Sequence, residues 1–294
     1  MYAVEELKRR GFSLVREMTN CHRASAKRIL DEAYSRWGVS PQHGISQQST
    51  LDEIEQLAFM DYIFCPNEMV EQSVREANGE GLKLLSTSYG WDPGRFASAT
   101  ATLQEMDGVT VLFVGSINVR KGVHLLLEIW KESKISGRLI LAGKMDPLIA
   151  QRCSDVLNRE DVVVMDYVDD IASLYRSADI FVFPTIEEGG PQVTYEAAAN
   201  SLAVITTPMG KGHILEDGQN GFVRDPFDRD GWIDCLRMLA NSREWRTQIG
   251  AMARKAADAF TWDKVGARRR HQLQNIWTPR KTALLRGGMV ETRL

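Results

Sequence analysis

Two segments of the chain combine charged side chains with glycines in a way that suits phosphate binding. The first is GSINVRKG, residues 115–122, which follows an apolar run at 109–114 and opens a helical pattern. A glycine-bounded loop there lets backbone N–H groups reach an anion, aided by the dipole of the next helix. Arg120 and Lys121 add two positive charges. The spacing is not that of a P-loop, and an ordinary turn with exposed basic residues is the alternative interpretation.

The second segment is EEGGPQVTYEAAA, residues 187–199, which follows another apolar run. Glu188 and Glu196 are separated by seven residues, and Gly189 and Gly190 lie between them. Consecutive glycines allow a close approach of the backbone to a ligand. A carboxylate accepts hydrogen bonds from adjacent hydroxyls, which suits a ribose diol. The alternative is an acid stabilised by the helix dipole, with Glu196 merely solvated.

Three further polar clusters carry weaker signals. His22 stands between an expected strand and an expected helix, where an imidazole can orient or relay a proton, or simply be a satisfied surface residue. The Asp-Arg-Asp run at 228–230 resembles a metal motif, but it precedes a helical stretch and is better explained as a helix cap. The basic run at 268–271 is typical of a solvated helix face, with a membrane-surface role as the alternative.

Alternating strands and helices position both glycine-containing segments. Short apolar runs predict strands at 109–114, 138–142, 162–165, 180–183 and 203–206. Between them, helical patterns cover 121–132, 147–158, the stretch from Asp169–Asp170 through Tyr175, and 192–200. Continuous apolar strands between amphipathic helices indicate a parallel sheet covered on both faces, so we expect a doubly wound domain.

The first hundred residues repeat this pattern less completely. Strands are expected at 13–16, 62–65 and 82–86, with helices at 24–37, 52–59 and 68–77 and a polar loop at 38–50. Three strands are fewer than a free-standing doubly wound sheet usually has. We therefore expect a partial Rossmann-like domain over 1–105, a complete one over 106–260, and a returning helix with a frayed tail over 261–294. The boundary should fall within 97–108.

Composition limits the function classes. The 294 residues include 36 Lys and Arg against 39 Asp and Glu, a formal net charge of −3 that excludes nucleic-acid binding driven by bulk charge. No apolar run could span a bilayer, and the N-terminal residues lack a secretory pattern. The four cysteines have neither metal nor redox spacing. We expect a cytoplasmic protein.

Taken together, these motifs resemble glycosyltransferase family 4, whose members have the two-domain GT-B fold. The resemblance covers roughly residues 15–277 and is strongest over 109–223. It includes VLFVGSINVRKGVHLLL, LILAG, SLYRSADIFVFPTIEEGGPQVTYEAAA, AVITTPMGKG and LEDGQNGFV, in the family's order and spacing. The fold class implied is α/β and GT-B-like.

The resemblance implies specific roles. Lys121 and Arg120 would hold the diphosphate of a nucleotide-sugar donor near Gly115 and Ser116, and Glu196 would hold the ribose. Glu188 would contact the sugar and phosphates together with the remaining residues of its loop, which are Gly189, Gly190, Pro191, Gln192 and Val193. The backbone near Tyr167 and Val168 would flank the base, and His22 would lie near the reacting sugar.

The implied reaction is metal-independent, cofactor-free sugar transfer with retention to a polysaccharide, lipid-linked or small-molecule acceptor. A peripheral contact with the inner membrane surface is an open alternative. Two departures from the family pattern stand out: Ser116 replaces a common Arg, and the opening glycine-rich loop of the first domain is missing, as in a truncated or split protein. A nucleotide-sugar epimerase, or a non-catalytic partner of an intact transferase, are the rival functions.

Overall fold

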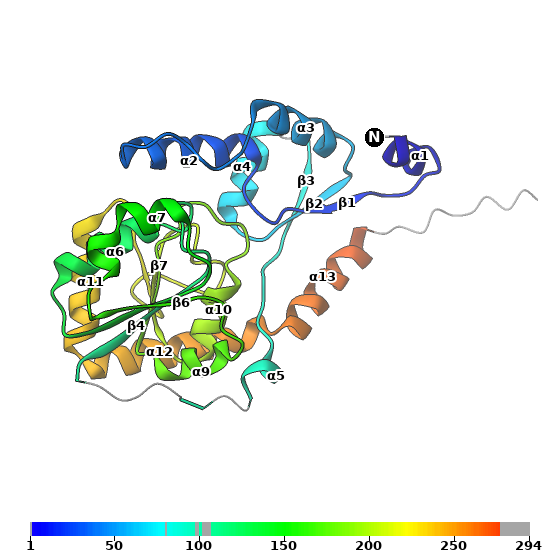
Figure 1. Cartoon of the computed structure of the whole chain (residues 1–294). Coiled ribbons are helices and arrows are strands. Elements are labelled where there is room, and N and C mark those ends of the chain that lie inside the picture. Colours follow the sequence, from blue (N-terminus) through cyan, green and yellow to red (C-terminus); the bar gives the residue numbers. More distant parts are fainter. Residues whose placement is uncertain (1, 80, 98–99, 102–106, 277–294) are drawn as a thin grey trace, which may run out of the picture.

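Two separate parallel sheets organise the chain, as the computed structural model shows (Figure 1). The structure describes residues 2–79, 81–97, 100–101 and 107–276. A six-stranded sheet belongs to the C-terminal half and a three-stranded sheet to the N-terminal half. The expected boundary at 97–108 falls largely on residues 98–99 and 102–106, which lie outside the described residues, as does the expected tail after Trp277.

The C-terminal sheet has the strand order β6-β5-β4-β7-β8-β9, with every pair parallel. Its strands are β4 Val109–Val114, β5 Gly137–Ala142, β6 Val162–Met165, β7 Ile180–Phe183, β8 Ala203–Thr206 and β9 Phe222–Val223. The central strands β4, β7 and β8 are buried almost throughout, which their continuous apolar sequences require. The first five strands were predicted from the sequence, whereas the two-residue β9 was not.

Amphipathic helices connect these strands and cover the sheet (Figure 1). They are α6 Val123–Ser133, α7 Pro147–Arg152, α8 Ser154–Leu157, α9 Ile171–Ser177, α10 Gln192–Ala199, α11 Arg229–Asn241 and α12 Arg243–Ala257. The single helix expected over 147–158 is instead two short helices that meet at Cys153. Asp170 accepts a hydrogen bond from the Ser173 N–H at 3.1 Å and so caps α9, as its position before the helical pattern indicates.

The N-terminal sheet has the order β1-β2-β3. Its strands are β1 Val15–Glu17, β2 Tyr62–Cys65 and β3 Lys83–Ser86, accompanied by α1 Tyr2–Arg9, α2 Arg23–Arg36, α3 Gln47–Ala58 and α4 Glu68–Asn78. The expected loop over 38–50 is wrong at its end, because α3 begins at Gln47. Ser46 caps this helix by accepting a hydrogen bond from the Ser49 N–H at 3.1 Å, so polar residues form its first turn.

Helix α2 connects the two halves of the molecule. Ala26, near its start, belongs to the small apolar core of the N-terminal sheet, whereas Ala33 and Tyr34 belong to the large core of the C-terminal half. Beyond the helix end, the Trp37 ring packs on the His124 ring with centroids 4.8 Å apart. Figure 1 shows α2 extending from the N-terminal sheet across the top of the C-terminal half. The helix therefore closes one side of the space between the halves.

The chain passes from the N-terminal half to the C-terminal half through α5 Pro93–Phe96, and it returns through α13 Trp262–Ile276. Trp91 and Thr261 form a parallel bridge where these segments meet. Along α13, Arg269 donates to Thr87 Oγ1 at 2.7 Å and Gln272 donates to the Ser86 carbonyl at 2.8 Å. Basic residues of the 268–271 run thus hold the helix against the N-terminal half. None of the helices in the described part of the chain has the length and apolar character needed to cross a bilayer.

Candidate functional site

The two glycine-containing segments form neighbouring loops at the carboxyl edge of the C-terminal sheet. One loop follows β4 and the other follows β7, which is the strand next to β4. Gly122 has a φ of +68°, and a Cβ built on it would lie 2.0 Å from the Pro184 carbonyl oxygen. A side chain at this position would therefore force the loops apart. Carboxyl-terminal strand edges are where open α/β sheets bind ligands.

Lys121 and Glu188 form an ion pair that joins the two loops. Their side chains are 14% and 9% exposed, and the Lys121 ammonium lies 5.3 Å from the centre of the Phe183 ring. The structure thus brings together two residues that sequence analysis selected. It also gives Glu188 a cationic partner within the protein, so this carboxylate is not a free nucleophile.

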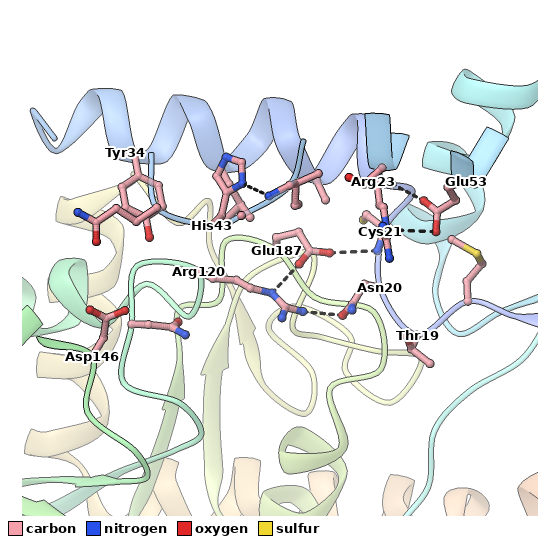
Figure 2. Close-up of a pocket in the computed structure, with 18 of the residues that line it drawn as sticks. Thr19, Asn20, Cys21, Arg23, Tyr34, His43, Glu53, Arg120, Asp146 and Glu187 are labelled. Atoms are coloured by element: carbon pink, nitrogen blue, oxygen red, sulfur yellow. Dashed lines mark hydrogen bonds and ion pairs between the residues drawn. The ribbon is translucent and has the colours of Figure 1, made fainter. Parts of the chain in front are cut away.

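Arg120 and Glu187 form a second pair beside the first, and this pair reaches the N-terminal half (Figure 2). Arg120 Nε donates to Glu187 Oε2 at 2.6 Å, and Arg120 Nη2 donates to Asn20 Oδ1 at 2.5 Å. Glu187 Oε1 accepts from the Cys21 N–H at 3.0 Å. Burial is the main cause that raises the pKa of the Cys21 thiol to about 12, and the Glu187 charge is the second. The thiol therefore stays protonated.

Sequence analysis did not select Glu187, Asn118 or Asn20. The doubled Glu-Glu before Gly-Gly is the signal that could have drawn attention to Glu187, which is only 2% exposed. Asn118 shapes the first loop, because its Oδ1 accepts from the Lys121 N–H at 3.0 Å. Gly122 N–H and Val123 N–H are bonded within the same loop. The expectation that loop N–H groups are free for an anion is therefore wrong for residues 121–123.

Glu196 is a buried carboxylate with three donors. Its Oε1 accepts from Arg95 Nη1 at 3.1 Å and Gln192 Nε2 at 3.0 Å, and its Oε2 accepts from Tyr175 Oη at 3.1 Å. Burial raises the pKa of Glu196, and these partners offset part of that increase. The alternative of a merely solvated Glu196 is wrong, since the residue is 4% exposed.

The Gly189–Gly190 pair meets polypeptide from the N-terminal half. A Cβ on Gly189 would lie 2.0 Å from the Thr19 carbonyl oxygen, and one on Gly190 would lie 2.4 Å from the Tyr89 ring. Asn67 Nδ2 also donates to the Gly189 carbonyl at 2.5 Å. On the side where a Cβ would stand, the close approach to these glycines is made by the protein itself.

His22 is a buried histidine at the start of α2. Its side chain is fully buried at the start of α2, where its Nδ1 accepts from the Ala24 N–H at 3.1 Å. Its Nε2 lies 3.7 Å from Glu53 Oε2, and burial lowers the pKa of the imidazole. His22 is therefore a helix cap and not a surface residue.

The remaining predicted site residues lie around the same sheet edge. Gly115 directly follows β4, with its N–H bonded to the Ala142 carbonyl at 3.0 Å, and Ser116 beside it is exposed. Tyr167 follows β6 and is 84% exposed, with Val168 half-buried. Pro191 is buried and Val193 is half-buried at the start of α10. The Asp228 side chain accepts from the Gly231 N–H, so the 228–230 run is a helix cap.

A polar cavity of about 590 Å³ lies between the halves, beneath α2 (Figure 2). The N-terminal half provides most of its lining, including Thr19, Asn20, Tyr34 and His43. The C-terminal half contributes Asn118, Arg120, Asp146 and Glu187. Arg120 is the one predicted site residue in this lining, so the cavity adjoins the loop pairs from the N-terminal side. Its volume is within the usual range for ligand pockets, about 300–1,000 Å³.

Comparison with solved structures identifies proteins that share this fold over most of the chain. A sucrose-phosphate synthase from Thermosynechococcus elongatus has a TM-score of 0.74 at 18% identity, over 92% of this chain and 70% of that one. Anabaena Alr3699/HepE in complex with UDP and glucose also has a TM-score of 0.74, at 13% identity, over 93% and 74% of the chains. The fold is that of the GT-B glycosyltransferases.

Sequence comparison gives matches that centre on the C-terminal half of the chain. Residues 108–242 match the family model described as glycosyl transferases group 1. The capsular polysaccharide biosynthesis glycosyltransferase CapM of Staphylococcus aureus is 30% identical over 159 residues, which are 52% of this chain and 42% of that protein. A D-inositol 3-phosphate glycosyltransferase of Paenarthrobacter aurescens is 30% identical over 39% and 28%. The matches thus span less than half of these relatives.

Proposed function

We propose that this chain transfers a sugar from a nucleoside diphosphate sugar to an acceptor hydroxyl. The observation that carries the proposal is the pair of loops after β4 and β7, which present Lys121 and Arg120 side by side next to a cavity. The family matched by residues 108–242 supports the same reaction class. The HepE neighbour, whose fold this chain shares, was solved with UDP and glucose.

The charge that develops on the leaving diphosphate is the main quantity that the site must stabilise. Lys121 is the cation placed for this task, because its side chain is mostly buried and lies at the end of the loop where α6 begins. Fixed charges in a site with little water stabilise a developing anion more than they would in bulk solvent. The proposed reaction therefore uses no metal ion, and Glu188 serves to orient the Lys121 ammonium.

Retention of anomeric configuration is the second part of the proposal. The sugar acquires oxocarbenium character as its bond to the diphosphate breaks. A double displacement would need a free carboxylate beside the anomeric carbon, but Glu188 and Glu187 are both paired with cations. We infer a front-face displacement in which the leaving phosphate guides the acceptor hydroxyl, as the family resemblance implies.

Ribose recognition is proposed for Glu196. A carboxylate has about four lone-pair sites, and three hydrogen bonds are already formed, two to Oε1 and one to Oε2, so Oε2 retains one acceptor site. The Arg95 side chain that covers it is half exposed and can move aside. Glu196→Gln should therefore weaken binding of a ribonucleotide more than binding of its 2′,3′-dideoxy analogue. Equal losses for the two ligands would assign Glu196 a structural role only.

Calorimetric titration tests the donor site directly. UDP, GDP, ADP and dTDP are titrated in the presence of a chelator, and at least one is expected to bind. Lys121→Ala should weaken that diphosphate by about 10- to 150-fold, the equivalent of about 1.5–3 kcal/mol for a charge-assisted contact, and leave the nucleoside unchanged. Lys131→Ala, which breaks a surface pair with Asp155, is the matched control.

A double variant separates binding from folding effects. Lys121→Met combined with Glu188→Gln removes the ion pair without leaving an unpaired buried charge. The same selective loss of diphosphate affinity is expected. Failure of all four nucleotides to bind the unmodified chain would refute the proposal. Sugar epimerisation without an acceptor would point to an epimerase instead.

A further inference from the structure

The proposed ribose-binding carboxylate, Glu196, is contacted by the short helix that connects the two halves. Arg95 of α5 donates from Nη1 to Glu196 Oε1 at 3.1 Å. Just before α5, Trp91 donates from Nε1 to a carbonyl at the end of α12 at 2.8 Å. The Phe96 ring, next to Arg95, meets the Tyr175 ring edge-on, with centroids 5.9 Å apart. These contacts hold α5 on the C-terminal half, beside α9 and α10 (Figure 1).

The two side chains of the Arg95–Glu196 ion pair differ in their exposure to solvent. The Glu196 side chain is 6% exposed, whereas the Arg95 side chain is 50% exposed. A pair of two exposed groups contributes little, because water and salt screen both charges. A buried carboxylate has instead lost much of its hydration, so a positive charge beside it matters more. The contact therefore affects chiefly the state of Glu196, while water can solvate the guanidinium.

In the described part of the chain, two ionisable side chains contact the Glu196 carboxylate. Arg95 comes from α5, and Tyr175 comes from α9 and donates from Oη to Oε2 at 3.1 Å. The third donor, Gln192, is a neutral amide. Burial raises the pKa of Glu196, and the Arg95 charge is the largest of the causes that lower it. Burial, followed by the Glu196 charge, raises the pKa of Tyr175, so the phenol stays a neutral donor.

The charge state of Glu196 decides how this residue can recognise a ribose. An ionised carboxylate only accepts hydrogen bonds, which matches the hydroxyl donors of a ribose. A protonated carboxyl group has one acceptor site fewer and an O–H that needs a partner of its own. Oε2 retains one acceptor site beside Tyr175, so a ribose hydroxyl can bind there while Arg95 stays on Oε1. Only a second hydroxyl would require the Arg95 side chain to move.

We propose that Arg95 is a positioning residue for the donor, which keeps the Glu196 carboxylate charged and aligned to accept a hydrogen bond from a ribose hydroxyl. The inference rests on the proposed function and adds to it a residue that acts through Glu196 without contacting the nucleotide. Because α5 belongs to the segment that connects the two halves, this connection takes part in recognition of the donor.

Comparison of a ribonucleotide with its 2′,3′-dideoxy analogue measures this role. Calorimetry gives both affinities at a series of pH values between 5 and 8, with whichever of UDP, GDP and ADP binds the unmodified chain. Both ligands carry the same base and diphosphate, so the ratio of their affinities reports the ribose contact alone. The ratio should favour the ribonucleotide, and this preference should decline toward low pH as Glu196 binds a proton.

Arg95→Gln keeps a hydrogen-bond donor but removes the charge. The pKa of Glu196 then rises, so the decline of the ribose preference should begin at a higher pH than in the unmodified chain. At pH 6 the preference should be about three- to tenfold lower, the difference between a charge-assisted and a neutral hydrogen bond. Arg95→Lys retains a positive charge and should keep most of the original pH profile. Arg159→Gln, which breaks an exposed pair with Asp161, is the matched control and should leave the profile unchanged.

A double variant tests whether Arg95 acts through Glu196. In a Glu196→Gln background there is no carboxylate to keep charged, so adding Arg95→Gln should not lower the ribose preference further. An additional loss in this background would mean that Arg95 contacts the nucleotide itself, and would overturn the inference. Equal losses for the two ligands in Arg95→Gln, whether partial or complete, would also overturn it, since the effect would then not lie at the ribose.

Failure of the proposed function gives a different result from failure of this inference. If UDP, GDP, ADP and dTDP all fail to bind the unmodified chain, the proposed function is refuted. If a ribonucleotide binds but Arg95→Gln leaves its preference and pH profile unchanged, only the role of Arg95 is overturned. Equal binding of the ribonucleotide and its dideoxy analogue by the unmodified chain, or binding of dTDP alone, would likewise overturn that role and leave the donor site intact.

Discussion

Two of the regions in which the N-terminal and C-terminal halves touch have opposite character. In the first, the end of α2 packs on the C-terminal half through rings: Trp37 lies on His124, and the Arg152 guanidinium lies 5.1 Å from the Trp37 ring centre. In the second, the loop at 19–21 meets the loop at 187–190 through Arg120, Glu187 and Asn20. The ring contact depends on buried apolar surface, whereas the polar contact uses charged groups that also line the cavity.

The difference suggests separate roles for the two regions: the ring contact holds the halves together, and the polar contact can also respond to a ligand. Aromatic packing is insensitive to a nearby anion, so the α2 contact can remain fixed when a diphosphate binds. The polar contact contains one mostly buried carboxylate and one guanidinium that is 34% exposed. A bound anion beside Arg120 would compete with Glu187 for it. We therefore expect substitutions in the first region to affect stability, and those in the second to affect ligand binding as well.

The largest expected effect is on the pH dependence of the free energy of unfolding, to which His124 in the ring contact contributes. Burial lowers the pKa of His124 to about 4, from an ordinary value of 6.5. The unfolded chain therefore binds a proton before the folded protein does, and stability falls as the pH drops from about 6.5 to about 4. The loss attributable to His124 is at most about 3 kcal/mol.

His124→Phe should remove this part of the pH dependence while retaining a ring against Trp37. The measurement is the free energy of unfolding by urea at a series of pH values between 4 and 7, compared with the unmodified chain. His271→Gln, at an exposed position on α13, is the control and should leave the slope unchanged. An identical slope in the His124 variant and the parent would show that the imidazole titrates normally in the folded state.

The second effect concerns the close approach in the polar region. Gly189→Ala places a Cβ 2.0 Å from the Thr19 carbonyl oxygen, so the two loops must separate. We expect a loss of about 1–3 kcal/mol in the free energy of unfolding, the usual cost of overpacking. Gly81→Ala, where a Cβ meets nothing within 4 Å, is the control. A variant as stable as its parent would mean that the halves do not approach this closely in solution.

The smallest effect is expected for Glu187→Gln. The amide retains an acceptor for the Cys21 N–H, and the partly exposed Arg120 is stabilised by water once its partner is neutral. A loss of about 1 kcal/mol in stability is expected, together with a change in nucleotide affinity. Glu132→Gln, which breaks a surface pair with Arg229, should change neither. A stability loss without any change in nucleotide affinity would make the Arg120–Glu187 pair purely structural.

Much of the C-terminal sheet could be predicted because its strands are continuous apolar runs. β9 escaped prediction because Phe222–Val223 is two residues long and carries no periodicity. The break between α7 and α8 was missed because the sequence has a helical pattern on both sides of Cys153 and no Gly or Pro between the two helices. In the N-terminal half, the start of α3 was missed because capping residues such as Ser46 have the composition of a loop.

The sequence predicted which residues belong to the candidate site, but it did not predict which side chains they pair with. The sequence selected Lys121, Arg120, Glu188 and Glu196, and all four lie on the loops and helix at one sheet edge. It could not assign Arg120 to Glu187 or Arg95 to Glu196, because these pairs join segments 67 and 101 residues apart. Gly189 illustrates the limit most clearly: the absence of a Cβ serves a ligand and a polypeptide neighbour equally well.

The central claim is that this chain transfers a sugar from a nucleoside diphosphate with retention. Proton NMR tests it most directly, by following the anomeric signals in a mixture of the chain, UDP-glucose and methyl α-D-glucopyranoside in the presence of a chelator; GDP-mannose and UDP-N-acetylglucosamine serve as further donors. The account predicts a new glycosidic anomeric signal with the configuration of the donor, which is lost in Lys121→Ala. An inverted product, or release of free sugar at the same rate with and without acceptor, would contradict it.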